Sequence, residues 1–327
     1  MKLRITHQTR YDYFPAVETA QHMAYLQPVS NPYQRLLSHA LLISPTPAQM
    51  TQTLDVFGNP RCFFSLQTPH SVLDVVAHSV VSTQTRALPA SRVTWEQARE
   101  QFRYQSGLPF DAATEFVFAS PFCPKAPEFA AYARPSFASG ISVLAAAQDL
   151  MQRIHSEFVY ESQSTHINTP ALQALAQRKG VCQDFAHIMI ACLRSMGLAA
   201  RYVSGYLLTQ AAPGTVKLRG SDASHAWVAV YAPDLPAGQR WCDFDPTNSR
   251  AGWHSPGEDY VTLATGRDFS DVSPLRGVIH GGASHTLTVG VTVEPVLDEM
   301  QSQSQTSSQS QTQSQSQSQS QTAKEIP

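Results

Sequence analysis

The sequence predicts an α+β protein with an N-terminal β-sandwich-like domain, an α+β core, a C-terminal strand and a disordered tail. Three observations lead to this prediction. Short apolar runs separated by turn residues occupy the first 85 residues, amphipathic helical patterns follow between residues 141 and 197, and strand patterns recur from residue 201. We expect a β domain at 1–85, a partly helical connection at 86–140, the core and its C-terminal strand at 141–296, and the tail at 297–327.

The β prediction for the first segment rests on alternation and on turn residues. Leu3 and Ile5 alternate with charged or polar neighbours, and apolar runs recur at 41–43 and 73–81. Between these runs, Phe57-Gly58-Asn59-Pro60 has the composition of a turn. The connection that follows is expected to be helical near 95–103, and prolines punctuate it across 121–135.

Two long helices are predicted in the core. Ser142 is a suitable N-cap for the first, in which apolar residues recur at steps of three and four as far as Phe158. A shorter helix is expected from Thr169-Pro170, as N-cap and first helical residue, to about Arg178. The second long helix starts near Cys182, and Gly197 stands where a glycine commonly ends a helix.

Strands and a tail complete the predicted core. Strand patterns lie at 201–208, 225–231 and 240–245, and alternating residues at 286–293 predict the C-terminal strand. Residues 301–322 contain only Gln, Ser and Thr. Such a segment has too little apolar surface to offset its ordering entropy, so we expect it to be disordered.

Composition narrows the classes of function. The chain of 327 residues has 23 Lys and Arg against 25 Asp and Glu, a net charge of −2, which argues against a polybasic nucleic-acid binder. No apolar run approaches the roughly 20 residues of a membrane-spanning helix. The first 15 residues lack the apolar segment of a signal peptide. We therefore expect a cytoplasmic protein without nucleic-acid or membrane partners.

Cysteine and histidine spacing argues against cofactors. The five cysteines are scattered and form neither a disulfide framework nor a C-x-x-C pair. The twelve histidines show no H-E-x-x-H or similar ligand spacing, and no D-x-D-x-D-G calcium loop is present. We expect neither a metal nor another cofactor.

One cysteine has a position that favours chemistry. Cys182 falls in the first turn of the second long helix, directly after Gly180-Val181. Unpaired N–H groups and the positive end of the helix dipole favour a thiolate there, and the same N–H groups could hold an oxyanion. The simpler interpretation is that Cys182 only packs at the helix start, as Cys192 does on the apolar stripe.

A nucleophilic thiol also needs a base, and two histidines are candidates. His187 lies about 140° round the helix from Cys182, which makes it a structural histidine. His225 begins the strand Ser224–Tyr231 and is the better candidate. If this strand forms a hairpin with 240–245 across the turn at 233–238, His225 can lie directly opposite Asp245, which would orient the ring. A register displaced by two residues would instead bring Asp243 to His225, so spacing leaves both aspartates open.

Four blocks occur together in the core: GVCQDFAH at 180–187, ARYVSGY at 200–206, SHAW at 224–227 and FDPTN at 244–248. Together they resemble bacterial members of the transglutaminase-like superfamily. Tyr260-Val261 and GRDFSDV at 266–272 resemble the C-terminal motif of that family. The N-terminal part, with its Phe57-Gly58-Asn59, resembles the β domain that precedes the core in these bacterial proteins. The resemblance covers nearly everything except the Gln/Ser tail.

The resemblance implies a papain-like core with Cys182 as nucleophile, His225 as general base and Asp245 as the orienting acid. It favours Asp245 over Asp243 because the family's aspartate precedes Pro-Thr-Asn. Papain-like enzymes often use an upstream side chain as second oxyanion donor, for which the polar residues between Tyr160 and Asn168 are candidates.

The implied activity is thiol-dependent acyl transfer on an amide or peptide carbonyl of a protein or peptide substrate. A thioester on Cys182 would be resolved by water, as in a peptidase or amidase, or by an amine, as in a transglutaminase. The alternative is a catalytically silent scaffold of the same fold that binds peptides or proteins. A metal hydrolase is a weaker third option because the ligand spacing is missing.

Overall fold

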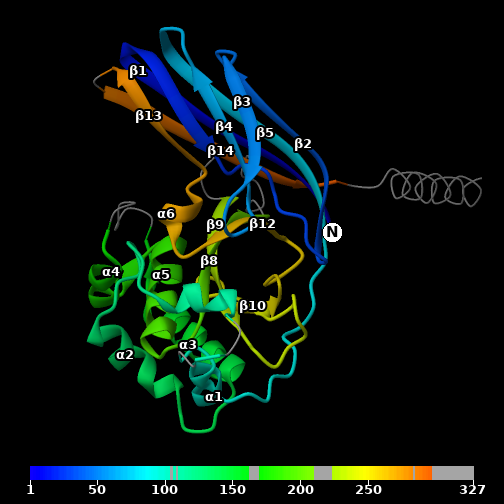
Figure 1. The fold of residues 1–327 in the computed structure, drawn as a ribbon, viewed down its shortest axis with the longest axis vertical. Coiled ribbons are helices and arrows are strands. Elements are labelled where there is room, and N and C mark those ends of the chain that lie inside the picture. Colours follow the sequence, from blue (N-terminus) through cyan, green and yellow to red (C-terminus); the bar gives the residue numbers. More distant parts are fainter. Residues whose placement is uncertain (104–105, 108–109, 162–168, 210–222, 283, 297–327) are drawn as a thin grey trace, which may run out of the picture.

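The computed structural model describes residues 1–103, 106–107, 110–161, 169–209, 223–282 and 284–296. A seven-stranded sheet lies above a layer of helices and a five-stranded sheet (Figure 1). The predicted disordered tail at 297–327 lies outside the described residues. The overall class is α+β, as the sequence predicts.

The N-terminal domain is built on one long strand. The strand order of its sheet is β2-β5-β1-β4-β3, and β13 and β14 also pair with β1. The bounds of these strands are β1 Lys2–Ala24, β2 Gln34–Ser44, β3 Gln49–Leu54, β4 Pro60–Leu66, β5 His70–Thr83, β13 Leu275–Gly281 and β14 Ser284–Pro295. The predicted turn at Phe57–Pro60 joins β3 to β4.

This sheet bends so that its two halves share a core. The first half of β1 pairs with β5 and β14, whereas its second half pairs with β4 and β13. The register of the β1–β5 pair shifts between Asp12 and Val17, an irregularity of the kind that bends a strand. Phe64 of β4 and Leu73 of β5 belong to one buried cluster. The domain is therefore sandwich-like, although its strands form one connected sheet.

The C-terminal strand does not stay with the core. We expected it in the segment 141–296, but β14 pairs along β1, with Val293 opposite Ile5 and Val291 opposite His7. Both valines are buried in a cluster with Leu3 and Ile5. The alternation of apolar and polar residues predicts the strand but not the strand with which it pairs. Pairing with β1 buries both valines against the apolar residues of that strand.

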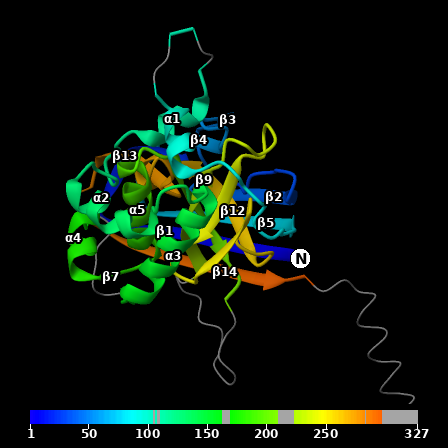
Figure 2. The ribbon, with the colours of Figure 1, turned by 90° about the horizontal axis from the view of Figure 1, so that it is seen from below.

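The core places its helices on one face of the second sheet, whose order is β11-β10-β9-β8-β12. Figure 2 shows α2, α4 and α5 on one side of β9 and β12, with β2 and β5 on the other side. The bounds are β8 Ala200–Leu207, β9 Ser224–Tyr231, β10 Trp241–Asp245, β11 Arg250–Trp253 and β12 Tyr260–Gly266, with α2 Pro127–Ala133, α3 Val143–Glu157, α4 Ala171–Gln177, α5 Cys182–Ser195 and α6 Phe269–Val272. Helices α1 Trp95–Glu100, η1 Ala112–Val117 and η2 Arg134–Ser136 lie in the connection, and β6 Val159–Tyr160 pairs with β7 Lys179–Gly180.

Helix ends follow the predicted signals with two corrections. The Ser142 hydroxyl accepts from the Ala145 amide at 3.3 Å and caps α3 as predicted. Pro170 is the N-cap of α4 rather than its first helical residue, because its ψ of 136° is extended. Helix α1 ends at Glu100, earlier than the pattern at 95–103 suggested.

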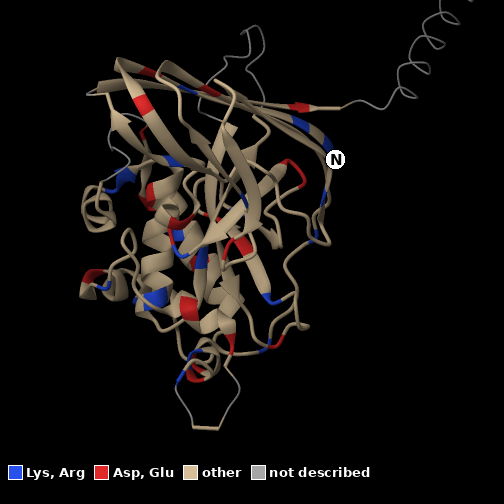
Figure 3. Cartoon of the chain, turned by 45° about the horizontal axis from the view of Figure 1, so that its top comes forward, with Lys and Arg blue, Asp and Glu red and all other residues tan. Residues whose placement is uncertain are grey.

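Charged residues of both signs are spread along the chain. In the cartoon of Figure 3, Lys and Arg lie interspersed with Asp and Glu in both the β domain and the core. Within the described ranges, no helix combines the length and apolar character needed to cross a bilayer.

Candidate active site

Cys182 is the first residue of α5 and differs from the other cysteines in exposure. It is partly exposed, whereas Cys62, Cys123, Cys192 and Cys242 are buried, and all five are free thiols. Val181, at the N-cap, donates its backbone N–H to the Asp184 carboxylate at 2.9 Å. The sulfur therefore stands at a capped helix N-terminus, the setting that the sequence predicts for it.

Gly180 allows the chain to enter this helix tightly. A β-carbon at Gly180 would lie 2.7 Å from both the β-carbon and a carboxylate oxygen of Asp184. Because Asp184 is also 3% exposed, there is little room for it to move. Glycine here lets the capping aspartate and Cys182 keep their positions.

The structure brings His225 to Asp245. The Nε2–H of His225 donates to the Asp245 Oδ2 at 2.7 Å, and the two side chains are 7% and 0% exposed. Burial opposes a charged ring, but hydrogen bonds to Asp245 and then to Cys182 raise the pKa of His225 to about 10. Since Nε2 is engaged by Asp245, Nδ1 is the ring atom left for the sulfur.

The hairpin forms, but its register differs from the predicted one. Asp243 lies opposite Ala229, so continuing the register would place Asp245 opposite Trp227 rather than His225. The prediction that Asp245 lies directly opposite His225 was therefore wrong. The observed register is displaced by two residues, in the direction that moves Asp243 further from His225. Asp245 reaches His225 diagonally, a distance that long side chains on one face can bridge.

Asp243 has a different partner. Its carboxylate accepts from the Trp227 indole N–H at 2.7 Å, and the tryptophan is completely buried. Burial raises the pKa of Asp243 to about 6, against the effects of Trp227 and Arg201. The structure thus separates the two aspartates that spacing left open: Asp243 holds an indole, and Asp245 holds the imidazole.

Residue spacing missed four further hydrogen bonds to Asp245. Its Oδ2 also accepts from the Asn248 amide and from the Tyr260 hydroxyl, each at 2.7 Å. Its Oδ1 accepts from the Thr247 N–H at 2.9 Å and the Asn248 N–H at 3.3 Å. Burial raises the pKa of Asp245, but the bonds from His225, Asn248 and Tyr260 outweigh burial and lower it. Asn248 lies in the FDPTN block, whereas Tyr260 comes from a separate strand.

His187 is structural, as its angle on the helix predicts. It is 2% exposed, and its Nε2 accepts from the Phe269 N–H at 3.2 Å. Burial lowers the pKa of His187 to about 3, so the ring is neutral. Most of the candidates for a second oxyanion donor, residues 162–168, lie outside the described residues.

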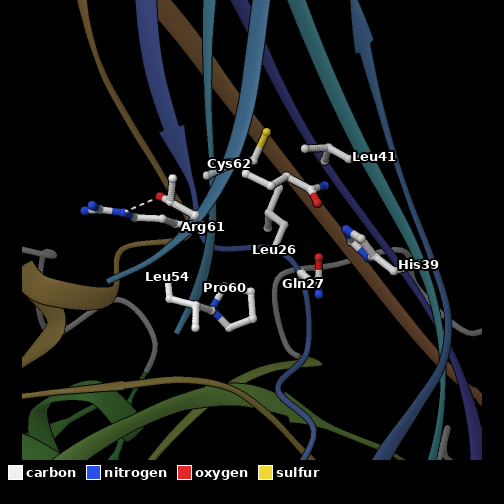
Figure 4. A pocket seen from close by; sticks show the side chains of 11 residues that line it. Leu26, Gln27, His39, Leu41, Leu54, Pro60, Arg61 and Cys62 are labelled. Atoms are coloured by element: carbon white, nitrogen blue, oxygen red, sulfur yellow. Dashed lines mark hydrogen bonds between the residues drawn. The ribbon is translucent and has the colours of Figure 1, made fainter. Parts of the chain in front are cut away.

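Two other observations bear on where the site lies. Among the described residues, no group of His, Cys, Asp and Glu has the arrangement of a metal site. A cavity of about 250 Å³ opens in the β domain, lined by Leu26, His39, Leu41, Leu54, Arg61 and Cys62 among others (Figure 4). His39 binds Ser79 at 2.9 Å there, and burial raises the pKa of Cys62, so the cavity offers no activated thiol.

Comparisons with known proteins agree with this architecture. The sequence pattern of the transglutaminase-like superfamily matches residues 130–246, and that of the bacterial transglutaminase-like N-terminal region matches residues 3–82. Over 305 residues the chain is 37% identical to uncharacterised proteins of Mycobacterium tuberculosis and Mycobacterium bovis, covering 90% of this chain and 93% of theirs. The chain belongs to the transglutaminase-like superfamily.

A further relative and a solved structure extend the comparison. An uncharacterised protein of Mycobacterium leprae is 30% identical over 295 residues, which cover 89% of this chain and 98% of that protein. The crystal structure of a candidate cysteine protease from Cytophaga hutchinsonii matches with a TM-score of 0.66 and 20% identity, covering 91% of this chain and 92% of that one. At this identity the match establishes a shared fold. The two domains of this chain therefore share the fold of that structure.

We expect Cys182 to be the most reactive thiol. Burial is the main cause that raises the pKa of Cys62, Cys123, Cys192 and Cys242, whereas Cys182 is partly exposed beside His225. At neutral pH iodoacetamide should alkylate Cys182 at least about tenfold faster than any other cysteine. Mass spectrometry of tryptic peptides after timed labelling measures the five rates. Equal rates would contradict the prediction.

Proposed function

We propose that this protein is a thiol-dependent acyl-transfer enzyme that attacks amide or peptide carbonyls of a protein or peptide substrate. Cys182 is the nucleophile, His225 the general acid and base, and Asp245 the residue that orients His225. The single observation that supports this most is the 2.7 Å bond from His225 Nε2 to a fully buried Asp245, on a ring that also hydrogen-bonds Cys182. This is the arrangement of nucleophile, base and orienting acid that acyl transfer requires.

The first half-reaction forms a thioester. A protonated ring beside the sulfur is the electrostatic setting in which a thiolate is stable. The thiolate of Cys182 attacks the carbonyl carbon, and the new S–C bond pushes the carbonyl electrons onto oxygen. The positive end of the α5 dipole at Cys182 favours this oxyanion. The oxyanion then collapses, the C–N bond breaks, and the His225 imidazolium gives its proton to the leaving nitrogen.

The second half-reaction releases the acyl group. The neutral ring of His225 takes a proton from water or from an amine as that molecule attacks the thioester carbon. The S–C bond breaks, and the sulfur leaves as the thiolate, so the pair returns to its starting state. Water yields a carboxylic acid and an amine yields a new amide. Neither step of the proposed mechanism uses a cofactor. The cytoplasmic location is a separate prediction, made from the sequence.

The proposal is tested by product analysis. Peptides containing Gln, Asn and ordinary peptide bonds are incubated with the wild type and with Cys182→Ala, each with and without a primary amine, and analysed by mass spectrometry. We expect products only with the wild type. A hydrolytic product identifies a peptidase or amidase, and an amine adduct identifies a transferase. Identical spectra for the two proteins would support the silent scaffold instead.

A further inference from the structure

Two amide side chains of the β domain bind the backbone of β12 as a neighbouring strand would. Gln34 donates to the Thr262 carbonyl and accepts from the Thr262 N–H, both at 2.7 Å. Asn59 does the same at Thr265, at 2.7 and 2.8 Å. A primary amide presents a donor and an acceptor side by side, as a peptide group does. The two contacts flank the register shift between Thr262 and Ala264 on β12.

These amides are themselves held in place. Gln34 is 4% exposed and Asn59 is 1% exposed. The second Gln34 amide hydrogen bonds the Val29 carbonyl at 2.7 Å, and that of Asn59 bonds the Asp55 carboxylate at 2.8 Å. Every amide hydrogen therefore has an acceptor. Because β12 is the edge strand of the core sheet, the β domain takes the place of the strand that the edge lacks.

Strand β12 begins with Tyr260, which reaches the candidate active site. Its hydroxyl donates to Asp245 Oδ2 at 2.7 Å, the oxygen that also holds His225. The phenol is 1% exposed, and its ring meets Trp227 edge to face, with centroids 5.4 Å apart. Thr262, which Gln34 binds, is only two residues further along the strand. Small movements of β12 must therefore change the contact between Tyr260 and Asp245.

We infer that the β domain positions the active site: Gln34 and Asn59 fix β12 so that Tyr260 shares the Asp245 carboxylate with His225. Tyr260 is thus a positioning residue that acts through Asp245. The inference rests on the proposed function, since it assigns Tyr260 a part in the same cysteine–histidine pair. The N-terminal domain would then act by positioning β12, without itself binding the substrate.

The charged and titratable groups around this oxygen set the direction of the effect. Cys182 faces His225 from α5, and Asp245 faces it from β10. The Arg250 guanidinium lies 4.8 Å from the Tyr260 ring centroid and pairs with Asp259 at 2.6 Å. Removing the Tyr260 hydroxyl takes one donor from Asp245 and leaves these charges unchanged. A carboxylate with fewer donors attracts the His225 proton more strongly, so the pKa of His225 should rise further and the imidazolium should persist to higher pH.

The test is an NMR titration of the His225 ring, which needs no known substrate. Tyr260→Phe should move the midpoint of this titration to higher pH by about half a unit or more. Gln34→Met removes the amide at nearly constant volume and should shift the titration in the same direction. Gln8→Met is the matched control, because Gln8 is a β-domain amide that binds Asp74 at 2.9 Å and leaves β12 untouched. Its His225 titration should match that of the wild type.

Each outcome decides one question. If folded Tyr260→Phe and Gln34→Met titrate at His225 as the wild type does, the positioning role is wrong. Circular dichroism identifies the folded variants, and the rate of Cys182 alkylation at neutral pH tests the proposed function separately. His225→Asn separates the two proposals. If His225→Asn alkylates like the wild type, the proposed function itself fails; if it is slow, the function stands whatever Tyr260→Phe shows.

Discussion

Asp245→Asn should slow turnover by roughly 10³–10⁴-fold while leaving the fold in place. The carboxylate accepts from His225, Asn248 and Tyr260 through one oxygen, and its charge keeps the ring protonated. An amide of the same size lacks this charge and can present a donor to the ring. The measurement is the rate of Cys182-dependent product formation, or the rate of Cys182 alkylation until a substrate is known.

The same variant makes a prediction about pH. The pKa of His225 is raised to about 10 in the folded protein, so its contribution to stability is complete below the ordinary value near 6.5 and is lost as pH rises toward 10. In Asp245→Asn the pKa of this ring should fall. The difference in unfolding free energy between wild type and variant should therefore narrow between pH 6.5 and 10. A constant difference over this range would show that His225 is not charged in the native protein.

Gly205→Ala should destabilise the protein by about 3 kcal/mol or more. Gly205 lies on β8 directly opposite His225. A β-carbon there would stand 2.1 Å from the Val261 carbonyl oxygen and 2.5 Å from the Trp227 ring. The oxygen belongs to the backbone of β12 and the ring is completely buried, so neither can move aside cheaply. Urea denaturation measures the loss.

Gly290→Ala is the control for this variant. Gly290 is also a strand glycine, in β14, and an added β-carbon would meet nothing within 4 Å. Its substitution should change the unfolding free energy by less than about 1 kcal/mol. Equal losses for the two alanines would mean that close packing between β8 and β12 is not what requires glycine at position 205.

Local patterns predicted much of the secondary structure. The start of α5 at Cys182, the cap at Ser142 and the strands of the β9–β10 hairpin agree with their signals. These features depend on residues a few positions apart, whose propensities and caps act within one element. The register of the hairpin was wrong by two residues, because side-chain alternation is the same for both registers and only packing distinguishes them.

The amino-acid sequence alone determined which residues could do chemistry: a cysteine at a helix start, a histidine opening a strand and an aspartate before Pro-Thr-Asn. Only the tertiary structure decided that Asp243 binds Trp227, that Tyr260 joins Asp245, and that Gln34 and Asn59 hold β12. The reason is physical. Each of these contacts joins separate strands, and a buried polar group takes whichever partner the packed fold brings within hydrogen-bonding distance.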